Sequence, residues 1–320
     1  AQALGLPDDK ALAELAVFKR SFDARKAALL AVYIVDVTLT ETAQEAALLA
    51  QHAGNPHIQP TPDMAYQPPP RAGSTDAAQA LRPVVIGFGP CGIFAALVLA
   101  QQGYRPIVIE RGKAVRQRTQ DTWGLWRKRA LDPESNVQFG EGGAGTFSDG
   151  KLNTGTKNPA HRLILETFVE AGAPRDILWD AKPHIGSDIL PTVVTAISQR
   201  IEQLGGIVRY RTKLVDIHID ASGAITGIDV QSSQDAAYEP IETKHLILAC
   251  GHSARDIFEL LKDHNVALAQ KTFAMGVRIE HPQRDIDRAQ YGPAAGHPAL
   301  GAAPYKLVAH LPNGRSVFSF

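Results

Sequence analysis

The fold is decided by the stretch Val84-Val85-Ile86-Gly87-Phe88-Gly89-Pro90-Cys91-Gly92, in which an apolar run leads into a glycine-rich turn. Its last six residues fit the pattern G-x-G-x-x-G. In that pattern the first glycine permits a tight turn, the second lets a pyrophosphate approach the backbone, and the third lets a helix lie against a strand. The hexamer alone is weak evidence for a nucleotide-binding loop, because a glycine-rich turn that binds no ligand also fits the pattern. The residues around it are therefore needed for the prediction. They predict a buried strand at 83–86, a buried helix at 90–102 and a buried strand at 106–109, which is a βαβ unit with a parallel sheet.

An acidic residue ends the second of these strands. Glu110 follows the first glycine at about the spacing of 20 residues that dinucleotide-binding units show. A carboxylate there accepts hydrogen bonds from ribose hydroxyls and repels a 2′-phosphate, which argues against NADP at this site. The candidate residues for binding the adenosine and pyrophosphate are Gly87, Gly89, Pro90, Cys91, Gly92, Glu110 and Arg111.

A second glycine cluster, Gly140-Glu141-Gly142-Gly143-Ala144-Gly145-Thr146-Phe147-Ser148-Asp149-Gly150-Lys151, favours FAD over NAD. An NAD domain usually continues with a third strand soon after its acidic residue, whereas here a basic polar segment follows. A glycine-rich backbone passes close to a flat ligand and donates N–H groups to it. Phe147 and Leu152 argue against the alternative of a solvated surface loop. The candidate flavin contacts are Gly142, Gly143, Ala144, Gly145, Thr146, Ser148, Asp149 and Lys151.

A third element returns the chain to the nucleotide. The apolar run at 246–249 predicts a buried strand that ends in Cys250-Gly251-His252, as flavoproteins of the glutathione-reductase-like fold often have near the first glycine loop. Cys250, Gly251 and His252 are therefore added to the cofactor candidates, together with Val215 on a strand predicted at 214–219.

These motifs together resemble a family of bacterial FAD-dependent dehydrogenases. The matching stretches are Lys19-Arg20-Ser21-Phe22-Asp23-Ala24-Arg25, Pro183-His184-Ile185-Gly186-Ser187-Asp188, and the segments 139–152, 251–256 and 273–282. The resemblance implies a small N-terminal domain, an FAD domain and a substrate-side domain inserted into it. Similar proteins continue with a Cys-x-Cys-Pro-Gly-Gly segment and a final flavin-contacting piece. Because this sequence stops within an apolar strand pattern, we expect it to be a fragment.

The predicted fold class is α/β, with a Rossmann-like, glutathione-reductase-like FAD-binding domain at 82–257. A small α+β domain at 1–54 and a Pro-rich linker at 55–81 precede it, and an incomplete substrate-side domain follows at 258–320. Periodicity predicts helices at 8–15, at 41–52 with Thr40 as N-cap, and at 188–204. Further strands are predicted at 32–39, 207–210, 225–230, 306–310 and 317–320, and around 278–281.

Composition narrows the function classes. The chain has 33 Lys plus Arg and 33 Asp plus Glu, so no charge excess favours nucleic acid or an acidic membrane. No apolar run reaches the ~18 residues of a membrane span. The two cysteines, Cys91 and Cys250, lack the spacing of a zinc or redox pair, and the histidines form no HxH or HxxxH cluster. We expect a cytoplasmic protein without a metal site.

Candidate catalytic residues are few, because a flavin itself transfers hydride or electrons. His184 and His252 adjoin the predicted cofactor loops and suit proton transfer, although each also suits a hydrogen-bonded loop residue. The basic segment 111–129 contains Trp123 and Trp126, and this composition permits contact with nucleic acid. It fits better a solvated helix whose arginines balance the charge of the FAD phosphates.

The sequence thus predicts an FAD-dependent oxidoreductase, a dehydrogenase acting on an unidentified small molecule, with NAD(P)H as a candidate electron donor. Two alternatives stay open: a flavin-dependent RNA-modifying enzyme, and a non-enzymatic FAD-binding redox sensor. No membrane partner is expected.

Overall fold

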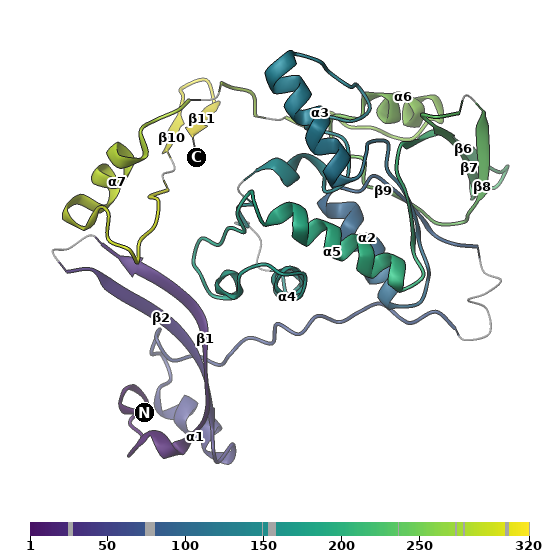
Figure 1. Ribbon diagram of the computed structural model, residues 1–320. Helices are drawn as coiled ribbons and strands as arrows, with labels where there is room; N and C mark the ends of the chain where they lie inside the picture. The colour runs from purple at the N-terminus through teal and green to yellow at the C-terminus, as the bar shows by residue number, and fades with distance from the viewer. Residues whose placement is uncertain are drawn as a thin grey trace. The chain divides into compact units, whose positions relative to one another are not determined.

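The computed structural model describes residues 1–24, 28–73, 81–148, 150–152, 158–235, 237–272, 274–277, 279–304 and 307–319 (Figure 1). The chain divides into two compact units. One comprises Ala1–Thr61, Trp179–Ala181 and Gln270–Phe320, and the other comprises Pro62–Leu178 and Lys182–Ala269.

A parallel sheet forms the centre of the larger unit. Its four strands lie in the order β5-β4-β3-β9, and β3 pairs in parallel with both β4 and β9. The residues of β3 are 0–4% exposed, which explains why the strand reads as an unbroken apolar run rather than an alternating one. The α/β class with a parallel sheet, predicted from the sequence, is confirmed. The strand bounds are β3 Val84–Ile86, β4 Ile107–Ile109, β5 Ile207–Arg209 and β9 Leu246–Leu248.

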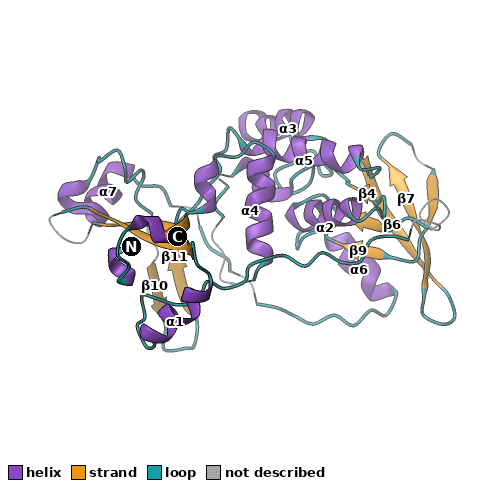
Figure 2. Ribbon diagram, turned by 90° about the horizontal axis from the view of Figure 1, so that it is seen from below, coloured by secondary structure: helices purple, strands orange, loops and turns teal. Residues whose placement is uncertain are grey.

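Two different layers cover the faces of this sheet (Figure 2). On one face, helices α2 (Pro90–Gln101) and α5 (Leu190–Gln203) share a core with Val85 and Val108. On the other face lie helix α6 (Arg255–Asp263) and a three-stranded antiparallel sheet, which share a core with Val84, Ile86 and Ile109. That sheet consists of β6 Thr212–Ile219, β7 Ile225–Ser232 and β8 Tyr238–Glu242.

Two more helices belong to the larger unit, α3 (Val115–Lys128) and α4 (Ala160–Glu170). Short 3-10 turns occupy Gly143–Phe147 and Arg175–Leu178. Within the described ranges, no helix of the chain is long and apolar enough to cross a membrane.

The smaller unit is built around an antiparallel ribbon of β1 (Leu12–Asp23) and β2 (Leu30–Leu39). It also contains 3-10 turns at Gln2–Leu4, Asp9–Ala11 and Gly292–Ala294, helices α1 (Ala43–Gln51) and α7 (Gln283–Tyr291), and a hairpin of β10 (Leu307–His310) and β11 (Ser316–Ser319). Arg20 on β1 makes a 2.7 Å ion pair with Asp180, and its amide donates to the carbonyl of Trp179. These two contacts bind the Trp179–Ala181 segment to the ribbon.

The N-terminal part corrects two predictions. The helix predicted at 8–15 is wrong: only a 3-10 turn forms at Asp9–Ala11, and β1 begins at Leu12, opposite Leu39. Pairing with β2 outweighs the helix propensity of the Ala, Leu and Glu residues there. The helix predicted at 41–52 is confirmed as α1, but its N-cap is Thr42, while the hydroxyl of Thr40 donates to the carbonyl of Lys10.

Elsewhere most predicted elements are found, with ends that shift by one or two residues. The exception is the strand around 278–281, since 279–281 are neither strand nor helix and Arg278 lies outside the described residues.

Candidate cofactor site

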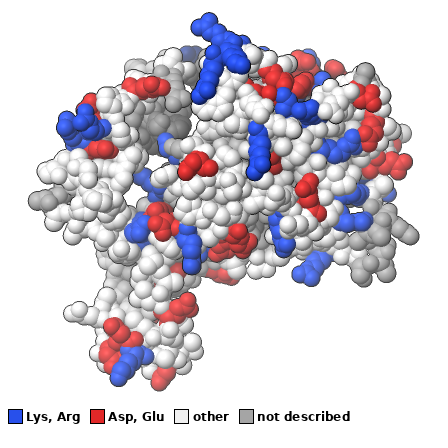
Figure 3. All heavy atoms as spheres, in the orientation of Figure 1, with Lys and Arg blue, Asp and Glu red and all other residues white. Residues whose placement is uncertain are grey.

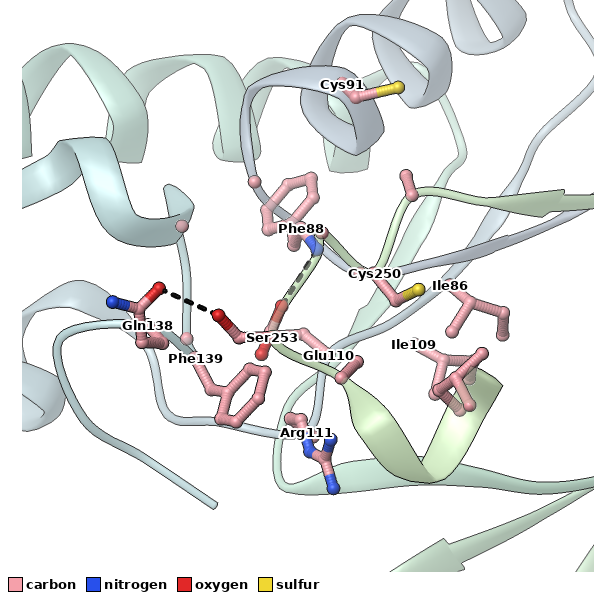
Figure 4. Close-up of a pocket in the computed structure, with 18 of the residues that line it drawn as sticks. Ile86, Phe88, Cys91, Ile109, Glu110, Arg111, Gln138, Phe139, Cys250 and Ser253 are labelled. Carbon is pink, nitrogen blue, oxygen red and sulfur yellow. Dashed lines mark hydrogen bonds between the residues drawn. The ribbon is translucent and has the colours of Figure 1, made fainter. Parts of the chain in front are cut away.

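A cavity of about 480 Å³ lies at the carboxyl ends of β3, β4 and β9. The chain runs outward from β3 through β4 to β5, and later returns on the other side of β3 as β9. Such a point, where the strand order reverses, is where open α/β sheets bind their ligands. The loops that follow β3, β4 and β9, the second glycine cluster and the start of β6 line the cavity (Figure 4).

The three glycines of the first loop have different surroundings. Gly87 has φ +95°, and a Cβ there would lie 2.5 Å from the carbonyl oxygen of Ala249 on the neighbouring strand. At Gly92 a Cβ would overlap the carbonyl oxygen of Gly87. At Gly89, by contrast, a Cβ would meet only the Cα of Gly143, at an ordinary 3.5 Å. The fold therefore requires glycine at 87 and 92, whereas position 89 leaves space that belongs to the cavity.

Gly89 is also the N-cap of α2, and no side chain among the described residues caps this helix end. The first-turn amides of a helix have no partner within the helix and lie at the positive end of its dipole. Pro90, at the first helical position, has no N–H to satisfy. The remaining amides of the first turn are suited to an anionic ligand.

Glu110 is 4% exposed and holds the turn after β3 in place. Its Oε2 accepts a 2.8 Å hydrogen bond from the amide of Phe88 (Figure 4), and its Oε1 accepts one of 2.8 Å from the amide of Gly112. Burial raises the pKa of the Glu110 carboxyl, against the opposing effect of these backbone hydrogen bonds. Each carboxylate oxygen has a second lone pair, so Glu110 retains accepting capacity on the cavity it lines.

The second glycine cluster lies directly against the first loop. The amide of Gly142 donates a 2.8 Å hydrogen bond to the carbonyl of Phe88. Gly143 has φ +65°, and a Cβ there would lie 2.8 Å from the Cα of Gly89. This close approach leaves no room for a side chain at Gly143. Gly140, Gly143, Ala144 and Gly145 line the cavity.

Arg118, on α3, supports this cluster from behind. Its side chain is fully buried and donates to the carbonyls of Asn136, Val137 and Glu141 at 2.7–2.8 Å, and to the hydroxyl of Thr146 at 3.2 Å. Burial lowers the pKa of the guanidinium to about 10, against the charges of Glu110, Glu141 and Asp121. The carbonyls that Arg118 binds fix the path of the loop into Gly140–Thr146.

Glu141 supports the same cluster from the other direction. Its carboxylate is buried and accepts hydrogen bonds from the amide of Val115 and from the hydroxyl of Tyr210, each 2.7 Å long. Burial, followed by the charge of Glu141, raises the pKa of the Tyr210 phenol. The cluster is thus tied to α3 and to the residue after β5.

Arg111 lines the cavity, but its charge is already matched. It pairs with Glu134 at 2.7 Å and with both carboxylate oxygens of Asp256 at 2.7 and 3.0 Å, and its guanidinium lies 4.5 Å above the Phe139 ring. Although burial opposes it, hydrogen bonding to Asp256 and Glu134 raises the pKa of Arg111. The stacked pair of Arg111 and Phe139 offers a flat surface rather than a free charge.

Comparison with known proteins agrees with an FAD-related chain. Residues 272–320 match the family described as "FAD-dependent protein, C-terminal domain-like". A Clostridium beijerinckii protein described as uncharacterized is 47% identical over 240 residues, which cover 75% of this chain and 44% of that protein. The chain therefore spans less than half the length of this curated relative. Of the stretches that carry the resemblance inferred from the motifs, the segment 273–282 lies within the part that matches this FAD-dependent family.

Two solved structures show similarity over part of the chain. One is Thermovibrio ammonificans THI4, with 16% identity, a TM-score of 0.40, and 59% of this chain and 64% of that chain covered. The other is the glycerol-3-phosphate dehydrogenase from Bacillus halodurans complexed with FAD, with 12% identity, a TM-score of 0.36, and coverage of 58% and 37%. At these values the similarity by itself assigns no activity.

The structure brings together many of the residues predicted for the site. Those that line the cavity come from all three predicted segments: Gly87, Gly89, Pro90, Cys91, Glu110, Arg111, Gly143, Ala144, Gly145, Cys250, Gly251 and His252. Burial raises the pKa of the Cys250 thiol, whereas Cys91 is exposed.

Other predicted residues lie outside the lining. Gly92, Gly142 and Thr146 stand directly behind it, and Val215 lies on β6 where the pairing with β7 shifts register between Leu214 and Asp216. Ser148 is exposed and donates to the carbonyl of Gly145 at 2.7 Å. Asp149 lies outside the described residues.

The two candidate histidines differ in position. His252 lines the cavity. His184 is exposed and forms an isolated antiparallel bridge with Lys151, away from the lining. Catalysis by either residue stays a prediction.

Several lining residues were not predicted from the sequence as cofactor contacts, among them Gln138, Phe139, Thr212, Lys213, Leu214, Ser253 and Ile257. The hydroxyl of Ser253 donates to Gln138 at 3.3 Å, which joins the third segment to the second (Figure 4). Gln138 and Phe139 immediately precede the glycine cluster, and this adjacency was the available signal. Arg118 and Glu141 were also missed as supports, because nothing in the sequence names their distant partners.

Proposed function

We propose that this chain binds FAD in the 480 Å³ cavity and forms the cofactor-binding part of a flavin-dependent oxidoreductase. The observation that carries the proposal is the meeting of the two glycine loops, where Gly89 and Gly143 approach without side chains beside the N-terminus of α2. The match of 272–320 to a family of FAD-dependent proteins supports it.

The pyrophosphate fits the first loop. The first-turn amides of α2 offer donors and a positive dipole end, and Gly89 leaves the space that a phosphate group requires. Arg111 is neutralised by Glu134 and Asp256, so backbone amides, rather than this arginine, meet the phosphate charge.

The adenosine fits the side of Glu110. Its buried carboxylate keeps lone pairs for ribose hydroxyls, and a 2′-phosphate beside it would bring two anions together in a poorly solvated place. Phe139, with Arg111 stacked on it, provides a flat surface in the same cavity.

The isoalloxazine is assigned to the second glycine cluster. FAD supplies hydride and electron transfer, and the chain's residues bind and orient it. Ala144 and Gly145 lie on the cavity, with Gly142 and Thr146 fixed behind them by Phe88 and Arg118. His252 on the same cavity is suited to hold or move a proton. The substrate is proposed to be a small molecule, with NAD(P)H as a candidate donor.

Anaerobic reduction tests the reaction class. The FAD-loaded protein that carries this chain is mixed separately with NADH, NADPH and each of a panel of metabolites. The flavin absorbance at about 450 nm, which falls when the flavin is reduced, is then followed. We expect at least one compound to bleach the flavin absorbance. We expect no bleaching in the Gly89→Val protein to which the same amount of FAD has been added. FAD that stays bound but is reduced by no compound would favour a binding protein instead of an oxidoreductase.

A further inference from the structure

The exposed side of helix α3 carries aromatic and basic residues that the cofactor site does not use. Trp123 and Trp126 are 47% and 54% exposed, and Arg116, Arg127, Lys128 and Arg129 are exposed beside them. Arg116, Trp123 and Arg127 are spaced by seven and four residues, which places them along one stripe of the helix. These six residues are termed the α3 outer face. A dense group of Lys and Arg side chains is visible in Figure 3 where the end of α3 lies in Figure 1.

The cations of the α3 outer face are not balanced by nearby acids. Within the described part of the chain, no ion pair involves Arg116, Lys128 or Arg129. The carboxylates of Asp121 and Asp132, which are close in sequence, both bind Lys113, at 2.7 and 3.1 Å. The patch therefore presents a net positive charge on a chain whose total charge is balanced.

The aromatic rings form a compact group with one of these cations. The Trp123 and Trp126 rings are 5.4 Å apart between centroids and nearly perpendicular, at 89°. The Arg127 guanidinium lies 4.5 Å above the Trp123 ring. Single-stranded nucleic acid is recognised by this combination, in which bases stack on aromatic rings and guanidinium planes while Lys and Arg follow the phosphates.

We propose that the α3 outer face binds single-stranded nucleic acid. An acidic protein surface would match the charges, but it lacks the regularly spaced flat bases that stack on exposed indoles beside each phosphate. A membrane-surface helix presents a continuous apolar face, whereas here the exposed Gln120 lies between Arg116 and Trp123. Nucleic acid uses both the rings and the charges.

This surface is separate from the cofactor cavity. Val115, Arg118 and Thr122 are the buried residues of α3, and Arg118 supports the second glycine cluster from this buried side. None of the six outer residues lines the cavity. Substitutions on the outer face should therefore leave FAD binding intact, and failure of one proposal is distinguishable from failure of the other.

The test uses a fluorescein-labelled, mixed-sequence single-stranded RNA of about 15 nucleotides, a length within the range of known binding sites. Fluorescence anisotropy should show binding that weakens with salt, with a log–log slope of about −2 to −3 for three or four phosphate contacts. Unlabelled RNA should quench tryptophan fluorescence, because two of the three tryptophans, Trp123 and Trp126, belong to the face and Trp179 does not. Trp126→Ala and Lys128→Glu should each weaken binding about fivefold or more.

Lys262→Glu, on the exposed side of α6, is the matched charge control and should leave RNA affinity within about twofold. Equal far-ultraviolet circular dichroism and equal thermal melting in all variants confirm folding, whether or not FAD binds. The proposal is overturned if RNA does not bind at low salt, or if Lys262→Glu weakens binding as much as Lys128→Glu does. Binding of polyphosphate or anionic phospholipid vesicles as tightly as RNA, with no quenching of tryptophan fluorescence, would also overturn the proposal. Such a result would mean that charge alone explains the binding and that the indole rings do not stack on bases.

Discussion

The amide of Gly142 donates a 2.8 Å hydrogen bond to the carbonyl of Phe88, and this contact joins two glycine loops that are far apart in the sequence. Phe88 is in turn held by Glu110, which accepts a hydrogen bond from its amide at 2.8 Å. Both loops are therefore held in place by hydrogen bonds within the chain. The cavity that both loops line keeps its shape only while they hold this shared position.

The first prediction concerns the space at Gly89. Gly89→Val should abolish FAD binding and leave thermal stability nearly unchanged, because a Cβ there contacts only the Cα of Gly143, at 3.5 Å. Gly92→Ala should instead destabilise the fold, since its Cβ would overlap the carbonyl of Gly87. Gly124→Ala, on α3 outside the cavity lining, is the matched control, because its Cβ would meet only the carbonyl oxygen of Ala130, at an ordinary 3.9 Å. Fluorescence titration with FAD and thermal melting distinguish the three variants. Unchanged FAD affinity in Gly89→Val would contradict the pyrophosphate assignment.

The second prediction concerns pH and Glu110. Burial raises the pKa of this carboxyl above its ordinary value of 4.5, so it takes up a proton at a higher pH than an exposed carboxyl does. The protonated form lacks the charge that strengthens hydrogen bonds from ribose. FAD affinity should therefore be intact above the raised pKa and fall as the pH drops through it. Glu110→Gln should bind FAD about 1–3 kcal/mol more weakly, with a profile that lacks this step. Identical pH profiles for the two proteins would show that Glu110 does not contact FAD.

A third prediction concerns Arg118. Arg118→Ala should lower the free energy of unfolding by roughly 3 kcal/mol or more, because several buried carbonyls lose their donor. Arg116→Ala, on the exposed side of the same helix, should change it by less than about 0.5 kcal/mol. Urea denaturation measures both values. Comparable losses in the two variants would mean that Arg118 is not a specific support of the second glycine cluster.

Cysteine labelling gives a fourth test that needs no redox chemistry. Cys91 is exposed and lines the cavity, while Cys250 is half-buried with a raised thiol pKa. In protein without FAD, a maleimide at mildly alkaline pH should therefore modify Cys91 faster than Cys250. FAD should protect Cys91, and mass spectrometry of Cys91→Ser and Cys250→Ser proteins assigns each modification. Labelling of Cys91 at the same rate with saturating FAD would place the ligand elsewhere.

The sequence predicted the first glycine loop because its parts are local. The strand, the loop, the helix and Glu110 lie within one βαβ unit, and each obeys a steric or hydrogen-bonding rule that acts over a few residues. The second cluster was predicted as a flavin contact from its glycine content and from the basic polar segment that follows Glu110 in place of a third strand. Its contact with Phe88 depends on how the chain returns across the sheet, which local rules do not give.

Long-range partners explain most of what was missed. Glu141 binds Tyr210, 69 residues away, and Arg118 binds carbonyls whose positions are fixed only in the folded chain. The error at 8–15 has a similar origin, since β1 forms only by pairing with β2. At 8–15 the tertiary contacts overrode a local helix propensity. At Arg118 and Glu141 no local sequence signal pointed to the contacts.

The identity of the bound cofactor tests the central claim most directly. The protein is stripped of ligand, reconstituted separately with FAD and FMN, and washed, and the flavin released on denaturation is measured by chromatography. The account predicts that FAD is retained in close to equimolar amount and FMN is not, because Gly87, Gly89 and Glu110 are arranged for the pyrophosphate and adenosine that FMN lacks. Equal retention of FMN, or retention of neither flavin, would contradict it.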